Sequence, residues 1–419
     1  MLIEGVEIKK NDKKELAWHL YNKKYDYPFE KIKIVGVIGT NGKTTTAKII
    51  YHILKEHGQH VGFLSCEEVW FDEEKIKTSW IYCDTEHVFK YFDKMIKKGI
   101  QIVVMKVDNY SFKEAFIYGI KFDALVYTNI ETEYINHEGY LDIQNRIGKH
   151  LSENGVVIVN TDNKNNSMLL EDMKNRLMIT YGLCSKATIT ASSIDSTPSI
   201  RFNCCIQRGI TARNDIEIDP MEFPVSINLL GKHNVYNTLA AIAATLIYGV
   251  LPEDIVKAFQ KFKGIKRRMY RIYNDVYQII DDMSHDPPSY EALFETIQSI
   301  DYENLYIVNA IIGNGGVDLN KNNALLIANW MKAMKSTKMI TTSSVDTVDE
   351  NYKVLDKEKE IFHKIFEEDE IVYEHKDRLK DALELALLYA GKNDLILLLG
   401  GHGMDEGENL VNKLLKEKN

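Results

Sequence analysis

The chain has 419 residues, of which 45% are hydrophobic and 27% are charged, and its net charge is −9. This composition is typical of a globular protein, and the length exceeds one ordinary hydrophobic core, so we expect two or three domains. The acidic balance argues against nucleic acid or an acidic membrane as the main partner. The sequence has no apolar run near the ~20 residues of a membrane span and no signal-peptide core, which predicts a cytoplasmic protein. Its five Cys show no metal-ligand spacing and predict reduced thiols without a zinc site.

Residues 36–46, Gly-Val-Ile-Gly-Thr-Asn-Gly-Lys-Thr-Thr-Thr, follow a predicted buried strand at 32–38 and precede an amphipathic helix that Gly58 ends. A glycine-rich turn in this position presents backbone N–H groups at a helix N-terminus, where the dipole favours anions. Lys43 would reach the β and γ phosphates of ATP, and the Thr44 hydroxyl would bind Mg²⁺. An ordinary strand-to-helix turn is the alternative, but Gly-Lys-Thr in this context is specific. The predicted ATP-binding residues here are Gly39, Thr40, Asn41, Gly42, Lys43, Thr44 and Thr45.

Strands and helices alternate from residue 31 to about residue 251, which predicts a mostly parallel, doubly wound α/β sheet covered on both faces, with one of its helices at 141–153. Residues 187–230 interrupt the alternation and predict a small antiparallel β-subdomain at the edge of the sheet. A second, Rossmann-like α/β series begins after a hinge at 263–268. We therefore expect a short N-terminal segment (1–30), a central ATP-binding domain (31–263) and a C-terminal domain (264–419).

The loop Gly-Thr-Asn-Gly-Lys-Thr-Thr at 39–45 resembles that of the Mur ligase family, whose members form amide bonds with ATP and include the muramyl-peptide synthetases and folylpolyglutamate synthetase. Later stretches match the family in order, so the resemblance covers nearly all of 31–419. It implies ATP and Mg²⁺ as cofactors and a ligase that joins a small acid to an amino-acid-like amine through an acyl phosphate. Because 1–30 is too short for the domain that holds UDP in the muramyl-peptide synthetases, a UDP-sugar substrate is less expected.

Three later stretches resemble family motifs that lie near the nucleotide. Gly-Lys-His-Asn-Val-Tyr-Asn at 231–237 resembles a family motif whose asparagines face the nucleotide, although Asn234 could instead cap the next helix. Arg-Arg-Met-Tyr at 267–270 corresponds to Gly-Arg-Met-Glu and implies an ATP-facing Arg268, although adjacent arginines could simply be solvated. Asp-Met-Ser-His-Asp-Pro at 282–287 matches Asp-Tyr-Ala-His-x-Pro. The implied nucleotide residues are Asn234, Asn237, Arg268 and Asp282, with His285 and Arg268 also catalytic.

The metal-binding stretches depart from the family. Residues 131–139 keep the layout of the family's Asp-His-Leu-Asp-x-His-Gly loop, with Glu133 for the Asp and a displaced His137, which could also be a solvated surface pair. Lys149 aligns with the lysine that many members carbamylate as a metal ligand, and we take it as a catalytic candidate, with a surface lysine as the alternative. The predicted metal ligands are Thr44, Asp108, Glu133 and His137.

The clearest departure is Lys106, which stands where the family has a glutamate that ligates Mg²⁺. A charged lysine repels a metal ion. Asp108 lies two residues on, hence on the same strand face, and could replace the glutamate. Alternatively, Lys106 could neutralise a phosphate or a substrate carboxylate. In either case the second metal site is in question.

Two glycine-rich stretches near the C-terminus, 313–321 and 399–405, resemble family loops, although they could merely turn the chain. They supply Asn314, Asp318 and His402, which with Lys106 are the predicted substrate residues. The family motif Asp-Asn-Pro-Arg, which selects diaminopimelate or lysine, is replaced at 341–346 by Thr-Thr-Ser-Ser-Val-Asp. Two other functions stay open at this point: an ATP-binding subunit that needs a partner protein, and a small-molecule kinase.

Overall fold

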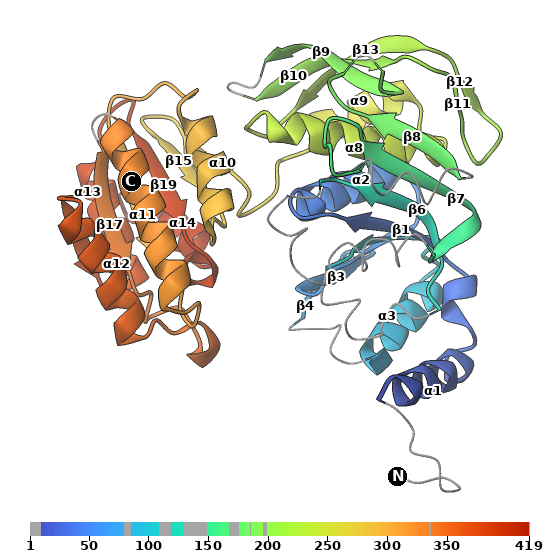
Figure 1. Cartoon of the computed structure of the whole chain (residues 1–419). Helices are drawn as coiled ribbons and strands as arrows, with labels where there is room; N and C mark the ends of the chain where they lie inside the picture. Colours follow the sequence, from blue (N-terminus) through green and yellow to red (C-terminus); the bar gives the residue numbers. More distant parts are fainter. Residues whose placement is uncertain are drawn as a thin grey trace, which may run out of the picture. The chain divides into compact units, whose positions relative to one another are not determined.

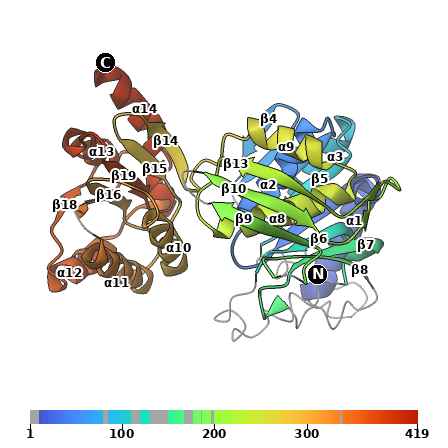
Figure 2. The same ribbon diagram turned by 90° about the horizontal axis from the view of Figure 1, so that it is seen from above.

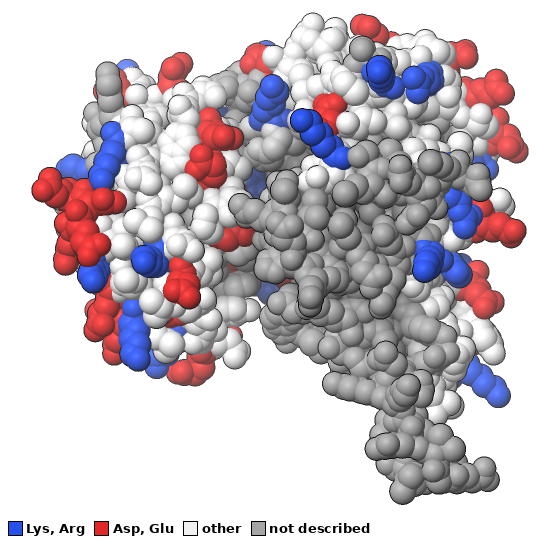
Figure 3. All heavy atoms as spheres, viewed as in Figure 1, with Lys and Arg blue, Asp and Glu red and all other residues white. Residues whose placement is uncertain are grey.

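Figure 1 shows the computed structural model of the chain, which describes residues 10–78, 85–108, 119–129, 149–166, 176–184, 186–195, 199–334 and 337–418. The chain forms two compact units. The N-terminal unit comprises Met1–Asp195, Ile200–Asn228 and Lys232–Phe262, and the C-terminal unit comprises Ser196–Ser199, Leu229–Gly231 and Lys263–Asn419. None of the helices in the described ranges is long and apolar enough to cross a membrane. On the face drawn in Figure 3, acidic and basic side chains are interspersed over the described surface.

The N-terminal unit is built on one eleven-stranded sheet with the order β13-β10-β9-β8-β7-β6-β1-β5-β2-β3-β4. Its central strand, β1 (Lys33–Ile38), pairs in parallel with β5 (Ile102–Lys106) on one side and β6 (Phe122–Tyr127) on the other. Every residue of β1 after Lys33 is buried, as is typical of a parallel strand covered on both faces. The other strands of the sheet are β2 (Val61–Leu64), β3 (Glu68–Phe71), β4 (Glu74–Lys77), β7 (Leu151–Asn160), β8 (Leu177–Tyr181), β9 (Ile189–Asp195), β10 (Ile200–Ile206) and β13 (Met221–Ile227).

Helices cover both faces of this sheet (Figure 1). On one face, α3 (Thr85–Lys97) packs Phe89 and Phe92 into a core with Ile34 of β1. On the other face, α2 (Lys43–Glu56) and α8 (His233–Ile247) contact each other. Neighbouring side chains of a strand point to opposite faces, so the apolar residues 34–38 of β1 supply a packing surface to both layers. The remaining elements of this unit are α1 (Lys10–Lys24), η1 (Pro28–Glu30), α9 (Pro252–Lys261), β11 (Ile210–Thr211) and β12 (Glu217–Ile218).

The antiparallel strands expected within 187–230 are β9, β10 and β13, which continue the main sheet beyond β8 at its edge (Figure 2). The helix expected over 141–153 is wrong at its end. Leu151 is the first residue of β7 and pairs with Phe122 of β6, so 151–153 form strand. Residues 141–148 lie outside the described parts of the chain.

The C-terminal unit contains a six-stranded sheet with the order β14-β15-β19-β16-β17-β18, parallel except for β14. Ile307 packs with α10 and α11 residues on one face, whereas Val308 packs with α13 residues on the other. The predicted doubly wound fold is confirmed. The strands are β14 (Tyr270–Asn274), β15 (Gln278–Asp281), β16 (Leu305–Ala310), β17 (Thr337–Thr342), β18 (Tyr373–Lys376) and β19 (Leu395–Leu399). The helices are α10 (Pro287–Ile297), α11 (Val317–Ala333), η3 (Glu350–Tyr352), α12 (Asp356–Glu368), α13 (Leu379–Tyr389), η4 (His402–Met404) and α14 (Gly407–Lys418).

Candidate active site

The predicted phosphate loop connects the end of β1 to the start of α2, and close contacts require its glycines. Gly39 has a φ of 134° and Gly42 a φ of 82°, both in the region that favours glycine. A Cβ at Gly39 would lie 2.1 Å from the Thr128 hydroxyl, and a Cβ at Gly42 would lie 2.3 Å from the side-chain oxygen of Asn237. The loop therefore packs directly against the residue after β6 and against α8.

Hydrogen bonds from residues 128–129 fix the backbone of the loop. The Thr40 amide donates to the Asn129 carbonyl at 2.8 Å, and the Asn41 amide donates to the Asn129 side-chain oxygen at 2.8 Å. The Thr128 hydroxyl donates to the Asn41 carbonyl at 2.6 Å. The fixed loop leads into the N-terminus of α2, where free N–H groups and the helix dipole attract phosphate.

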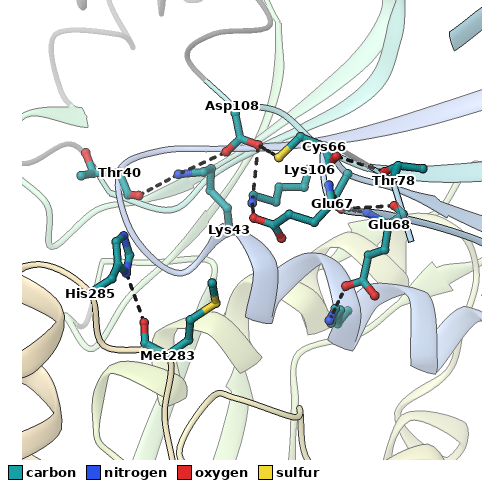
Figure 4. Close-up of polar contacts among 12 residues, drawn as sticks. Thr40, Lys43, Cys66, Glu67, Glu68, Thr78, Lys106, Asp108, Met283 and His285 are labelled. Carbon is teal, nitrogen blue, oxygen red and sulfur yellow. Dashed lines mark hydrogen bonds and ion pairs between the residues drawn. The ribbon is translucent and has the colours of Figure 1, made fainter. Parts of the chain in front are cut away.

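Lys43 folds back over the loop (Figure 4). Its Nζ donates to the carbonyls of Gly39 at 2.9 Å and Thr40 at 2.7 Å, and it lies 4.0 Å from Asp108 Oδ1. Two backbone carbonyls satisfy an ammonium group without neutralising its charge. Lys43 therefore keeps a positive charge at the loop. A phosphate group can replace the two carbonyls as the partner of this charge.

Two asparagines of α8, Asn234 and Asn237, lie beside the phosphate loop and the first turn of α2. Asn237 is buried, its Nδ2 donates to Asn234 Oδ1 at 2.8 Å, and its Oδ1 accepts from the Thr46 hydroxyl at 3.2 Å. Asn234 lies inside the first turn of α8, whose N-cap is Lys232, so the capping alternative for Asn234 is wrong. Asn237 thus contacts the helix that follows the phosphate loop and Asn234 contacts Asn237, while a direct contact of either residue with nucleotide stays a prediction.

Lys106 lies at the end of β5, paired in register with Val37 of β1, one residue before the end of that strand. Its side chain is 8% exposed, and its Nζ lies 3.2 Å from Glu67 Oε1 and 3.5 Å from Asp108 Oδ2 (Figure 4). Burial by itself lowers the pKa of Lys106, but Asp108 and Glu67 outweigh burial, and the pKa is raised. Lys106 is thus a permanent buried cation beside the phosphate loop.

Asp108, a predicted metal ligand, is surrounded by donors. Its Oδ2 accepts from the Cys66 thiol at 3.1 Å and faces Lys106, while its Oδ1 faces Lys43. Burial and the Asp108 carboxylate raise the pKa of Cys66, so this thiol stays protonated and can donate. Asp108 is therefore the anion shared by two lysines, one on the loop and one on β5.

The other predicted residues of the N-terminal unit do not join this cluster in the described structure. Glu133 and His137 lie outside the described residues. Lys149 is exposed in the turn before β7, and the next residue, His150, accepts a hydrogen bond through its carbonyl from the Phe122 amide at 2.8 Å. Because β6 starts at Phe122, Lys149 lies where the parallel strands begin, about 20 Å from the ends that carry the phosphate loop. In this register Lys149 lies away from the phosphate loop, and its catalytic role stays a prediction.

In the C-terminal unit, Arg267 is built into the fold. Its guanidinium contacts the carboxylate of Asp281 and donates to the carbonyls of Gly400 and Gly401, and its side chain is only 13% exposed. The Asp281 side chain is 1% exposed. Burial raises the pKa of Asp281 to about 7, although Arg267 lowers it. This pair joins β15 to the loop after β19.

Arg268, the predicted ATP-facing arginine, has a different environment. Its neighbours Arg267 and Met269 both have positive φ, 61° and 47°. Asp282 holds this turn, because its Oδ2 accepts from the Met269 amide at 2.8 Å while its Oδ1 accepts from the Ser284 hydroxyl at 2.6 Å. Asp282, predicted to bind ATP, is therefore a positioning residue for the turn that presents Arg268.

The remaining predicted residues of this unit follow the ends of β15, β16 and β19. His285 is 51% exposed, and its Nδ1 lies 3.1 Å from the Met283 carbonyl. Asn314 donates to the carbonyls of residues 350 and 351 at 3.0 and 2.9 Å, so its side chain holds a loop. Asp318 is exposed in the first turn of α11. His402 lies 2.9 Å from Asp405 Oδ2 and against the ring of residue 352.

One cluster was missed by the sequence reasoning. The hydroxyl of Thr341, in β17, lies 3.1 Å from His363 Nε2 and 2.9 Å from His375 Nδ1. Burial, followed by His375, lowers the pKa of His363 to about 4, and burial also lowers the pKa of His375. The three residues are spread over 35 positions, so no local spacing signals them. The available hint was that this strand, Lys-Met-Ile-Thr-Thr at 338–342, ends in two threonines that are buried.

Two family models match the sequence: "Mur ligase middle domain" over residues 37–245, and "Mur ligase, glutamate ligase domain" over residues 267–402. The chain belongs to the Mur ligase family. It is 26% identical over 387 residues to UDP-N-acetylmuramoyl-L-alanyl-D-glutamate--2,6-diaminopimelate ligase 1 of Clostridium acetobutylicum. The matched region covers 90% of this chain and 75% of that relative. This Mur ligase is accordingly an ATP-dependent enzyme that forms an amide between a carboxylate and an amine through an acyl phosphate. Membership favours the ligase over the small-molecule kinase.

Solved structures share the fold of this Mur ligase. MurF from Acinetobacter baumannii has a TM-score of 0.70 at 18% identity and covers 97% of this chain and 81% of its own. MurF ligase from Thermotoga maritima, solved in complex with ADP, has a TM-score of 0.65 at 14% identity and covers 95% of this chain and 85% of its own. The family and the fold class predicted from the sequence are confirmed.

Proposed function

We propose that this ligase places the γ-phosphate of ATP on the carboxylate of a small-molecule acid and then joins that acid to an amino-acid-like amine. The single observation that carries the proposal is the phosphate loop, in which Lys43 Nζ at the N-terminus of α2 contacts two backbone carbonyls and Asp108. In the first step a carboxylate oxygen attacks Pγ and ADP leaves. In the second, the amine nitrogen attacks the acyl carbon, phosphate leaves, and loss of a proton yields the amide.

The chain's own residues have distinct parts in this scheme. Lys43 balances the charge that develops on the phosphates, as the lysines of other phosphate loops do. Arg268, held on the turn fixed by Asp282, supplies a second cation for the nucleotide or the acyl phosphate. We propose that the two units correspond to the domains expected at 31–263 and 264–419; Lys43 belongs to the first unit and Arg268 to the second.

Mg²⁺ fits the start of α2. A single protein hydroxyl suits this ion, because Mg²⁺ keeps most of its water and binds mainly through substrate phosphates. Thr44 is half-buried on the first turn of α2, directly after Lys43, and the described residues supply its hydroxyl with no hydrogen-bond partner. We propose that Thr44 holds Mg²⁺ with the phosphates; when bound, the ion would neutralise phosphate charge.

The identity of the amine is where this chain differs from its relatives. The printed name of the Clostridium relative specifies 2,6-diaminopimelate. Here Thr341-Thr342-Ser343-Ser344 stand in place of the motif that selects diaminopimelate in the family, and the first of them is bound to two histidines. We propose an amine without the second carboxylate of diaminopimelate, because the replacement removes the arginine of that motif.

The test is phosphate release from Mg-ATP by the purified protein, with and without a small-molecule extract of cells, followed by mass spectrometry. We expect extract-dependent phosphate together with a product equal in mass to acid plus amine minus water. A stable phosphorylated product with no condensed species would contradict the second step. Phosphate release that never depends on an added acid would contradict the first.

A further inference from the structure

Four charged side chains form an alternating row at the phosphate-loop edge of the N-terminal unit (Figure 4). Lys43 Nζ lies 4.0 Å from Asp108 Oδ1, Asp108 Oδ2 lies 3.5 Å from Lys106 Nζ, and Lys106 Nζ lies 3.2 Å from Glu67 Oε1. The row comes from α2, the end of β5 and the turn between β2 and β3. Lys106 sits inside the row, so each of its carboxylate neighbours already has a cation.

This arrangement bears on a second divalent cation, which the family resemblance implies beside the first. A cation site in this position needs carboxylate oxygens that are free to bind the metal. Asp108 gives one oxygen to Lys43 and the other to Lys106 and Cys66. Within the described ranges, no group of three or more His, Cys, Asp or Glu residues could hold a metal ion. The described residues at this edge of the sheet do not fit a second metal ion.

Burial strengthens this conclusion. The side chain of Lys106 is 8% exposed and that of Asp108 is 19% exposed, so water screens their interaction only weakly. An ammonium group and a divalent cation that share one carboxylate repel each other strongly in such a place. The pairing of β5 with β1 also fixes the backbone of Lys106 beside the end of β1.

We propose that the Lys106 ammonium is a built-in cation that takes the place of a second divalent ion, so that this ligase uses one divalent cation per ATP. The inference rests on the proposed function, because it concerns the same nucleotide. Lys106 does not touch the reacting atoms. It is a positioning residue that keeps Asp108 beside Lys43 and supplies fixed positive charge at the end of β5.

The test counts bound Mn²⁺, a paramagnetic substitute for Mg²⁺, by electron paramagnetic resonance on the full chain with a non-hydrolysable ATP analogue. The unaltered protein should bind about one Mn²⁺ per chain. Lys106→Glu removes the cation and adds a carboxylate beside Asp108 and Glu67, and it should raise the count to about two. Lys106→Gln removes the charge alone and should add a weaker second ion, which covers the case in which the glutamate variant fails to fold.

The matched control is Lys48→Gln. Lys48 also makes a part-buried ion pair, 2.6 Å from Glu68 with 15% of its side chain exposed, but it does not pair with Asp108. Its replacement should leave the Mn²⁺ count unchanged. Two Mn²⁺ ions on the unaltered protein, or a count that stays at one in both Lys106 variants, would overturn the inference. If the unaltered protein binds no nucleotide in the same titration, the proposed function itself fails, and the inference fails with it.

Discussion

The phosphate loop of the N-terminal unit and the Arg267 turn of the C-terminal unit each place a cation at the end of a parallel sheet, but they hold it in opposite ways. Lys43 is bound by two carbonyls that lie within four residues of it. Arg267 is bound by Asp281 and by carbonyls of residues 400 and 401, more than 130 positions away. The first set of contacts can be exchanged for a ligand, whereas the second joins distant parts of the fold.

The difference shows that the contacts of a charged side chain indicate its role better than the sequence motif in which it lies. Arg267 and Arg268 are adjacent, and the family pattern Gly-Arg-Met-Glu points only to the second. In the structure Arg267 forms a buried ion pair with Asp281 and donates to two backbone carbonyls. Arg268 has no such partner among the described residues, so it is the arginine left for a ligand.

The largest effect is expected at Lys43. Lys43→Ala should lower turnover on the order of 10³-fold or more, because a fixed cation at the transferring phosphate is lost. The free energy of unfolding should change by less than about 1 kcal/mol, since Asp108 keeps Lys106 as a partner and the carbonyls of residues 39 and 40 lose one donor. Phosphate release and urea unfolding of the same preparation measure both. Lys48→Ala, on the same helix, is the control, and turnover retained by the Lys43 variant would remove the loop from the mechanism.

A smaller effect, on stability instead of rate, is expected at Arg267. Arg267→Met leaves Asp281 buried without its cation and should cost about 3 kcal/mol, at the low end for a broken buried pair because Asp281 can take up a proton. Denaturant unfolding at neutral pH measures the loss. Arg268→Met is the matched variant, and it should lower turnover while changing stability by no more than about 0.5 kcal/mol.

The double variant Arg267→Met with Asp281→Asn tests the cause of that loss. Removing both charges should recover much of the stability, because the penalty comes from the uncompensated carboxylate. Equal losses in the single and double variants would show that shape, not charge, explains the role of Arg267. A loss of stability in Arg268→Met as large as in Arg267→Met would erase the distinction between the two residues.

The features predicted correctly from the sequence are those set by short-range patterns. The β1 strand, the glycine loop and α2 follow from an apolar run, from Gly39 and Gly42 and from helical periodicity within 25 residues. The same holds for the alternating elements of the C-terminal unit. The β3–β4 hairpin was missed because its strands have four residues each and β4 is largely exposed and charged.

A residue's role is hardest to predict from the sequence where it depends on distant partners. Lys149 matches a family position by order along the chain, but the parallel register of β6 and β7 carries it to the opposite edge of the sheet. Asp282 and Asn314 carry motif letters, yet they bind loops of their own unit. Pairing of this kind depends on the sheet order, which a single sequence does not specify.

The smallest expected effect is a loss of folding stability at acidic pH. It is expected in the C-terminal unit, which contains the cluster of Thr341, His363 and His375. The pKa of His363 is lowered to about 4, below its unfolded value, so the unfolded chain binds the proton more readily. The stabilisation is complete above about pH 6.5 and is lost as the pH falls toward 4. Discounted for partial exposure, the loss between about pH 7.5 and pH 5 is roughly 1 kcal/mol.

Urea unfolding at both pH values should show a smaller loss for His363→Gln, which keeps a donor for Thr341, than for the unaltered protein. His285→Gln, at an exposed histidine, is the control, and equal losses in His363→Gln and the unaltered protein would assign the acid sensitivity to other groups.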